Sequence, residues 1–399
     1  MAEYFYVLLL LLSSNSICYA QAHFGLSAVL FIAFSGVLYF VKRAYRYTNN
    51  ASVYIAIFCI MILINRFVFY TDVSNLAWLE TIILAIGSYF YFAAFDYNRF
   101  RRAFLNVMCV ITLLNIIIFL LDQYGMAPIQ NVYINEVSWR MVGPFVTGRS
   151  EAWGRMAGLW HEPGAFQIYL NSVLLIYAPL CAQNMLSTKE WLKIFIVVLG
   201  VILTFSTMGY IVLAMIGFTV ALSMLKNASW FYKIVAIAVL PMIFYVVSHS
   251  EVVMDKLQQS RDSEVETSLG VRERDNVASL RMAIEHPLTG FGINSIEYKT
   301  RSLAWDNESA SNGLLRMSAM LGIWWLFMYF LYLYKAVRRL KLHPLLLALI
   351  IVILMQSNEA YVQYPISYMF IVQFYPSCCV PLPNRRVVED VNKPMFNQL

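Results

Sequence analysis

Long apolar runs, interrupted by short basic loops, constrain the fold of this chain more than any other feature of its sequence. Hydrophobic residues make up 60% of the 399 residues and charged residues only 13%, whereas a soluble domain is about half apolar and a quarter charged. A helix that crosses a bilayer needs about 20 apolar residues. These observations predict an all-α polytopic membrane protein with about twelve transmembrane helices. The candidate spans lie near residues 4–20, 24–41, 52–70, 76–95, 103–121, 165–182, 191–207, 209–225, 231–248, 313–334, 344–357 and 364–379.

The distribution of lysine and arginine predicts how these spans are oriented. Short cytoplasmic loops of membrane proteins are enriched in basic residues, and here every basic loop falls on one side when the spans are counted. Both termini are therefore expected in the cytoplasm. The net charge of +6 indicates this bias, and no nucleic-acid partner is expected. The run at 4–20 is interpreted as a span because Glu3 precedes it, whereas a signal peptide begins with basic residues.

Two long loops then fall on the opposite, outer side of the membrane. Charged residues beside a lipid-embedded scaffold are costly, so we interpret those in the loops as functional. The expected organisation is N-terminal helices at 1–121, a first outer loop at 122–164, central helices at 165–248, a large outer loop at 249–312, and C-terminal helices with a cytoplasmic tail at 313–399.

The end of the first outer loop gathers charged residues next to a predicted helix start. Pro163 favours the first turn of a helix, so Glu162 either complements the positive end of that helix or acts as a general base on an acceptor hydroxyl. His161 could act in the same way or contact phosphate. The other candidates in this stretch are Arg140, Arg149, Arg155 and Trp160, whose ring could stack on a sugar.

The second outer loop contains a loosely amphipathic helix that carries Arg281 and ends at Pro287, where Gly290 and Gly292 allow a tight turn. Guanidinium groups bind phosphate in a bidentate manner and stay charged, so the outer arginines suit an anionic lipid-linked substrate. Each could instead be a solvated residue or a lipid-headgroup anchor. The set comprises Arg66, Arg140, Arg149, Arg155, Arg261, Arg272, Arg274, Arg281, Arg301 and Arg316.

Further polar candidates lie at predicted helix ends. Glu308 and Asn312 precede the run at 313–334, either as a polar cap or as substrate ligands, and Tyr210 belongs to a short outer turn between two spans. The sequence lacks the motifs that bind nucleotides or catalytic zinc. Its six cysteines have no CxxC spacing and are interpreted as small buried hydrophobes. No metal and no cofactor are therefore expected.

Three segments, in order, resemble a known family. GLWHEPGAF at 158–166 resembles the G-x-x-x-E-P-x-x-F signature of bacterial Wzy-type oligosaccharide repeat-unit polymerases. The segment from Arg281 to Gly292, with HPLTGFG at its end, resembles a motif of the O-antigen polymerase/ligase superfamily. SASNGLLRMSAMLGIWW at 309–325 resembles the segment that follows in that superfamily.

This resemblance implies a GT-C-like fold and a metal-independent, inverting glycosyltransferase of the bacterial inner membrane, with its active site facing the periplasm. Its donor would be a growing glycan on undecaprenyl diphosphate, and its acceptor the next lipid-linked repeat unit. Membrane lipid and a separate chain-length regulator would be further partners. Arg281 matches the arginine of the family that is expected to contact the diphosphate, and Arg155 or Arg272 would assist it. Negative charge grows on this leaving group in the transition state, so such charges lower the barrier.

Three other functions compete with a polymerase, of which a non-catalytic scaffold would not need arginines clustered beside a helix N-terminus. An O-antigen ligase shares the donor but transfers glycan to lipid A-core, and the ligase branch typically has a His–Asn pair where this chain has Ser311–Asn312. A transporter or flippase of lipid-linked sugars would show internal repeats and charged, broken helices at mid-membrane. This chain concentrates its charges in the outer loops instead, which favours the polymerase.

Overall fold

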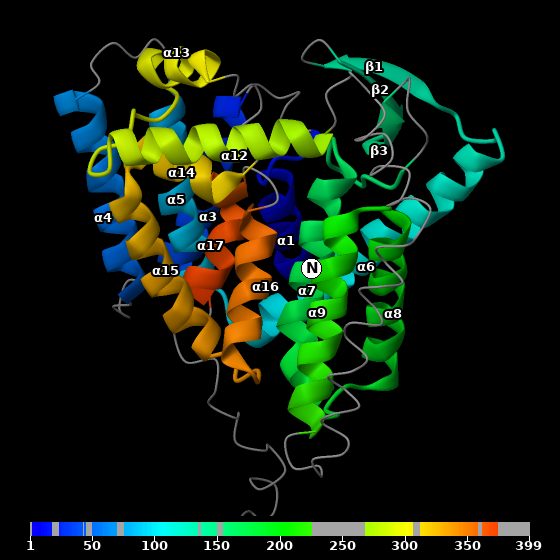
Figure 1. Cartoon of the computed structure of the whole chain (residues 1–399). Helices are drawn as coiled ribbons and strands as arrows, with labels where there is room; N and C mark the ends of the chain where they lie inside the picture. The colour runs from blue at the N-terminus through cyan, green and yellow to red at the C-terminus, as the bar shows by residue number, and fades with distance from the viewer. Residues whose placement is uncertain are drawn as a thin grey trace, which may run out of the picture.

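In the computed structural model the described residues are 2–17, 24–42, 44, 50–69, 76–134, 137–149, 155–225, 268–305, 312–357 and 361–373. Over these ranges the chain is mostly α-helical (Figure 1). The α-helices are α1 (Ala2–Leu12), α3 (Phe24–Val41), α4 (Asn50–Ile64), α5 (Ala77–Ala94), α6 (Tyr97–Gln123), α7 (Pro163–Ala182), α8 (Thr188–Leu203), α9 (Thr207–Met224), α12 (Ser268–Glu285), α13 (Ile296–Ala304), α14 (Gly313–Leu321), α15 (Ile323–Arg338), α16 (Leu345–Ser357) and α17 (Pro365–Tyr368). Single turns of other helix types are η2 (Asn65–Phe69), η4 (Tyr361–Gln363) and η5 (Met369–Gln373).

Five of the described helical segments are long and apolar enough to cross a membrane. They are Ala51–Val68, in α4 and η2, and the helices α5, α6, α7 and α9. Several spanning helices in one chain are the mark of a polytopic membrane protein, as the apolar runs predicted. The total of twelve spans stays a prediction, because the run at 231–248 and the residues after 373 lie outside the described ranges. The GT-C-like arrangement also stays a prediction.

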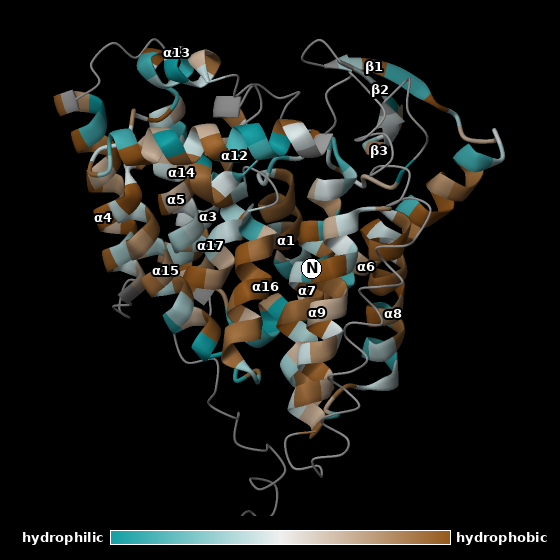
Figure 2. Cartoon of the chain, viewed as in Figure 1, coloured by the Kyte–Doolittle hydropathy of each residue, from teal (hydrophilic) through white to brown (hydrophobic). Residues whose placement is uncertain are grey.

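A polar layer covers one end of the helix bundle. Figures 1 and 2 show α12 lying across this end, with α13 and the small sheet at the same end, while hydrophobic residues follow the helices below. The layer consists of residues from the two loops that were predicted to lie outside the membrane. A bundle with one polar end and apolar sides is the expected shape for helices surrounded by lipid. We refer to this end as the outer end.

The first outer loop contains a β-sheet that the sequence analysis missed. Strands β1 (Gln130–Ile134), β2 (Val137–Val142) and β3 (Phe145–Arg149) form an antiparallel sheet in the order β1-β2-β3. Gly143, with a φ of +56°, supplies the backbone conformation that the tight turn between β2 and β3 needs. The predicted loop at 122–164 thus contains regular structure that the sequence analysis did not anticipate. The sheet packs over a small separate core formed by Ile17, Trp139, Met141, Val146 and Ala157.

The predicted span at 313–334 is not one continuous helix but two, α14 and α15. Gly322 separates α14 from α15 with a φ of +87°, and a Cβ atom there would lie 2.6 Å from the Pro287 carbonyl oxygen. The Pro287 carbonyl accepts a hydrogen bond of 2.8 Å from the Ile323 N–H. The Phe291 and Gly292 N–H groups donate to carbonyls of α14 at 2.9 and 2.8 Å. The PLTGFG turn thus occupies the break, so the second and third motifs form one structural unit.

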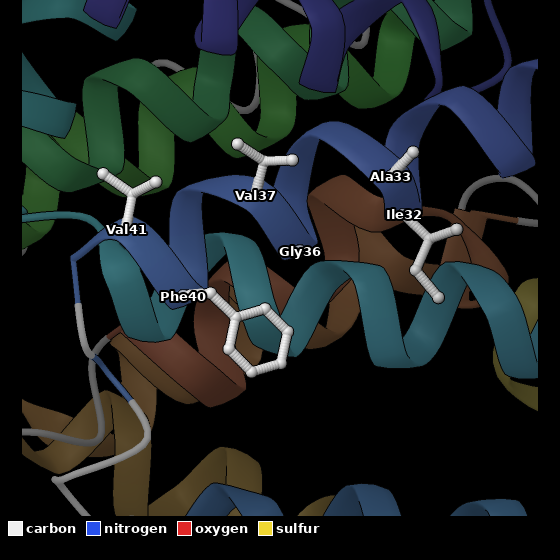
Figure 3. Close-up of a pocket in the computed structure, with 6 residues that line it drawn as sticks. All are labelled: Ile32, Ala33, Gly36, Val37, Phe40 and Val41. Atoms are coloured by element: carbon white, nitrogen blue, oxygen red, sulfur yellow. The ribbon is translucent and has the colours of Figure 1, made fainter.

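The side of the bundle at α3 is apolar. Figure 3 shows a shallow hollow along α3, lined by Ile32, Ala33, Gly36, Val37, Phe40 and Val41. Phe40 is 62% exposed and Val41 is 71% exposed, exposures that suit contact with lipid tails. Because no lining residue carries an ionisable or nucleophilic group, this hollow is not a candidate for chemistry. The chemistry-bearing side chains lie at the outer end.

Candidate functional site

The first motif forms a turn that leads into α7. Gly158 has a φ of +66°, and a Cβ atom there would lie 2.9 Å from the Phe166 ring. The Gly158 carbonyl accepts a hydrogen bond of 2.8 Å from the N–H of Val146 in β3, and the Arg155 N–H donates to the Thr147 carbonyl at 3.1 Å. These contacts fix the motif between the sheet and the helix bundle.

His161 and Glu162 lie at the N-terminus of α7, where the sequence places them. Both side chains are partly exposed. Glu162 is the N-cap residue and its carbonyl accepts from the N–H groups of Ala165 and Phe166, but its carboxylate makes no capping hydrogen bond. The His161 ring contacts the Trp139 ring edge to face, with centroids 6.1 Å apart. The Glu162 carboxylate therefore lies at the positive end of α7 without being used as a cap.

The Arg155 side chain is held by the turn between α8 and α9. Its Nε donates to the Thr204 carbonyl at 3.3 Å, and its Nη2 donates to the Phe205 carbonyl. Burial lowers the pKa of this guanidinium, while nearby Tyr210 and Glu162 act in the opposite direction. The last carbonyls of a helix lack partners within it, so Arg155 satisfies the end of α8. Arg155 lies within electrostatic reach of Glu162, as the shared motif suggested. Its N–H groups, however, bind backbone carbonyls of the protein.

Two aromatic candidates have clear roles in packing. Trp160 is fully buried, and its ring stacks on Tyr169 at 4.0 Å and on Phe166 at 5.5 Å between centroids. Its Nε1–H donates to the Ser14 carbonyl at 2.9 Å, so neither face of the ring is open to a sugar. The structure places Trp160 in the core and not among the substrate ligands. The Tyr210 hydroxyl donates to the Ile202 carbonyl at 2.7 Å and closes the turn at the end of α8.

Arg140, a predicted substrate ligand, forms an ion pair with Asp122 at the end of α6. Its Nη2 lies 2.6 Å from Oδ1 of a carboxylate that is 2% exposed, whereas the Arg140 side chain is 29% exposed. A buried carboxylate is strongly destabilising without a partner. The ion pair therefore connects β2 with α6, and the Arg140 guanidinium is already bound by a carboxylate of the protein. The sequence offered no way to see this pairing.

We expect Arg140→Ala to lower the free energy of unfolding by about 1–3 kcal/mol, because the Asp122 carboxylate is left buried without its partner. Thermal unfolding of the purified chain measures this loss. Asp122→Asn combined with Arg140→Ala should recover most of it, since a neutral amide costs less to bury. If the double variant is as unstable as the single variant, Arg140 stabilises the fold in another way.

Arg281 lies on the polar layer, on α12. Its guanidinium lies over the Trp305 ring, 4.8 Å from the centroid, a cation–π contact that orients the side chain without neutralising its charge. One turn further on, Glu285 pairs with Arg301 of α13 at 3.5 Å. The Arg281 side chain is exposed and is therefore available to a ligand at the outer end.

Arg316 is a candidate that the sequence analysis noted among the outer arginines but did not include among the site residues. It lies on α14, where its Nη2 donates to Asn294 Oδ1 at 3.4 Å, and its buried Nε has no hydrogen-bond partner among the described residues. It also faces Tyr298 of α13: burial raises the pKa of the Tyr298 hydroxyl, and the positive charge of Arg316 opposes this rise. The sequence did contain a signal for this residue, because Arg316 is a charged residue in the first turn of an otherwise apolar helix.

The structure gives less information on the remaining candidate residues. Asn312 is the N-cap of α14, and its side-chain oxygen accepts from the N–H groups of Leu314 and Leu315 at 3.1 and 3.2 Å, which supports the cap interpretation. Arg272 and Arg274 lie on α12. Arg149 is the last residue of β3, and Glu308 lies outside the described residues. Within the described ranges, no group of three or more His, Cys, Asp or Glu side chains is placed to hold a metal ion.

A row of aromatic rings connects the first motif with α14. Trp160 stacks on Tyr169, Tyr169 contacts Tyr361 with centroids 5.8 Å apart, and Tyr361 contacts Tyr364 at 5.9 Å. Tyr364 lies within electrostatic reach of Arg316. Aromatic contacts of this kind are well packed and directional, so His161 and Glu162 are held in one framework with Arg316.

Residues 192–330 match a family model described as O-antigen ligase, over about a third of the chain. This match supports the similarity of the chain to the O-antigen polymerase/ligase superfamily. The motif from Arg281 to Gly292, the α14 segment and Arg316 all lie inside the match, so the predicted resemblance is confirmed. Superfamily members are glycosyltransferase-like enzymes, and the first motif lies outside the matched segment. No curated protein and no solved structure matches the chain.

Proposed function

We propose that this chain is a metal-independent, inverting polymerase that joins undecaprenyl-diphosphate-linked repeat units on the periplasmic face of the inner membrane. An acceptor hydroxyl attacks the anomeric carbon of the donor glycan. The bond between that carbon and the diphosphate oxygen breaks, and the configuration at the carbon inverts. The hydroxyl proton passes to a base of the chain, and the diphosphate leaves with the electron pair.

The observation that carries this proposal is a pair of guanidinium groups on the outer layer, both inside the matched segment. Arg281 lies over Trp305 and Arg316 lies beside Asn294. Neither forms an ion pair within the part of the chain that the structure describes. Guanidinium groups bind phosphate oxygens strongly, and charged groups at a membrane boundary are usually functional. These two arginines would stabilise the departing diphosphate.

Glu162 is our first choice for the base, because its carboxylate is partly exposed and does not cap α7. We expect Glu162→Gln to lower the rate of polymerisation by about 10²–10⁴-fold, the usual contribution of a general base. Glycan synthesis by membranes that contain equal amounts of each variant measures the rate. Glu297→Gln, at an exposed glutamate of α13, is the matched control. If Glu162→Gln synthesises glycan at the normal rate and His161→Gln does not, His161 is the general base.

A ligase is the second candidate, because the matched family model is described as O-antigen ligase. The ligase alternative predicts a histidine where Ser311 stands, before Asn312. This chain has a serine there and thus no histidine base at this position, and the Asn312 side-chain oxygen caps α14. We therefore favour the polymerase.

A strain that lacks this chain discriminates between the functions. Loss of a polymerase leaves a single repeat unit on lipid A-core, which is the result we expect. Loss of a ligase leaves lipid A-core bare while polymer accumulates on the lipid carrier. Loss of a flippase leaves lipid A-core bare and no polymer, and either of the last two results would overturn the polymerase assignment. Complementation with the intact chain is the control.

A further inference from the structure

A second concave site lies at the end of the bundle that is opposite to the polar layer. The cavity has a volume of about 520 Å³. It lies where α7 and α9 end and where the chain turns from α15 into α16. Because α7 begins at the outer end, a site beyond Ala178 is distant from His161 and Glu162 by the length of a spanning helix. The cavity is therefore separate from the candidate catalytic site.

The rim of this cavity is basic. Arg338, Lys341 and His343 contribute to the lining, with Gln183 and Ser223 as neutral polar neighbours. The described residues that line it include no carboxylate. Three helices present their C-terminal ends here, and the negative end of a helix favours cationic side chains. The guanidinium of Arg338 and the ammonium of Lys341 therefore lie at a rim formed by helix ends, and no carboxylate of the described lining faces them.

Hydrogen bonds fix the loop that carries Lys341 and His343. The Ser223 hydroxyl donates to the His343 carbonyl at 2.9 Å and accepts from the His343 N–H at 3.1 Å. Leu340 and Leu342 are buried on either side of Lys341, whose backbone has a φ of +55°. A non-glycine residue rarely adopts this conformation, and here it lies between two buried leucines while Lys341 itself is exposed. The loop therefore presents Lys341 outward at the cavity rim.

The opposite wall of the cavity is apolar, formed by Pro179, Ala182, Leu342 and Leu345. A site with a basic rim and an apolar wall matches an amphiphile with an anionic headgroup. The basic loops of the sequence place this end at the cytoplasmic surface, where anionic lipids attract clustered lysine and arginine. We propose that the cavity binds the phosphate of an anionic phospholipid of the cytoplasmic leaflet, with an acyl chain along the apolar wall.

The test uses the purified full chain in a neutral detergent, titrated with phosphatidylglycerol, phosphatidylcholine or inorganic phosphate, with bound lipid measured by native mass spectrometry. We expect selective binding of phosphatidylglycerol. Arg338→Ala with Lys341→Ala should weaken it by at least about tenfold, as expected for the loss of charge-assisted hydrogen bonds. The matched control is Lys42→Ala with Lys189→Ala, which removes two exposed lysines outside the cavity. If the first double variant does not fold, Lys341→Gln replaces it.

Three results would overturn the proposal. Equal weakening in the control variant would show that total charge, and not the cavity, attracts the lipid. Equal binding of phosphatidylcholine would remove the role of the basic rim. Displacement of phosphatidylglycerol by inorganic phosphate at a similar concentration would identify a free anion as the ligand and leave the apolar wall unused. Thermal unfolding without lipid, equal for the two double variants, ensures that the comparison concerns binding.

Discussion

Gly290→Ala will destabilise the folded chain by about 2–5 kcal/mol, a large share of the stability of a typical protein. Gly290 has a φ of +61°, and a Cβ atom there would lie 2.5 Å from the Met320 carbonyl oxygen. Two costs therefore add: a left-handed backbone and a contact with the backbone of α14 that no side-chain rotation relieves. The same turn is held by the Asn65 side-chain amide, which donates to the Thr289 carbonyl.

Thermal unfolding of the purified variant in detergent measures this effect. Gly125→Ala is the matched control, since Gly125 has a φ of +66° but nothing lies within 4 Å of the position of its Cβ atom. The control reports only the cost of the left-handed backbone, about 1–2 kcal/mol. Equal destabilisation of the two variants would mean that the PLTGFG turn does not pack against the α14 backbone as described.

Arg281→Ala will lower glycan polymerisation by at least about 100-fold, the usual cost of removing one group that stabilises transition-state charge. The change also removes the cation–π contact with Trp305. Arg281→Lys retains the charge but loses bidentate phosphate binding, so we expect an intermediate rate. The surface glycan ladder of complemented cells, with the membrane level of each variant checked, measures these effects.

Arg301→Ala is the matched control for Arg281→Ala. Arg301 is also exposed on the outer layer, but it pairs with Glu285. An isolated exposed ion pair contributes at most about 1 kcal/mol to stability, so this variant should give a normal ladder. A ladder from Arg281→Ala that is indistinguishable from that of Arg301→Ala would remove Arg281 from the site. The contact with the diphosphate would then be assigned to Arg316.

The helical part of the fold could be predicted from the sequence, because apolar length and capping residues are local signals. Pro163 begins α7 and Asn312 caps α14, as the sequence indicated. The break at Gly322 could not be predicted, since it depends on a carbonyl of Pro287 that is distant in the sequence. The alternating residues of β2 were a usable signal for the missed sheet, and the charges in the same stretch obscured it.

The candidate site was harder to predict because core and ligand roles require the same residue types. Trp160 could stack on a sugar, but its ring is enclosed by Tyr169 and Phe166. Arg140 could bind phosphate, but a carboxylate of α6 binds it instead. Only the tertiary structure decides such cases. His161 and Glu162 were located correctly at the start of α7, whereas their chemical roles stay predictions.

Reconstitution of the purified full chain with a lipid-linked repeat unit tests the central claim most directly. The polymerase proposal predicts lipid-linked dimers and longer chains, with one undecaprenyl diphosphate released for each glycosidic bond formed. It also predicts that Arg281→Ala and Glu162→Gln lower both products together. Glycan transfer to added lipid A-core without any chain growth, by a folded protein, would contradict the claim and identify a ligase.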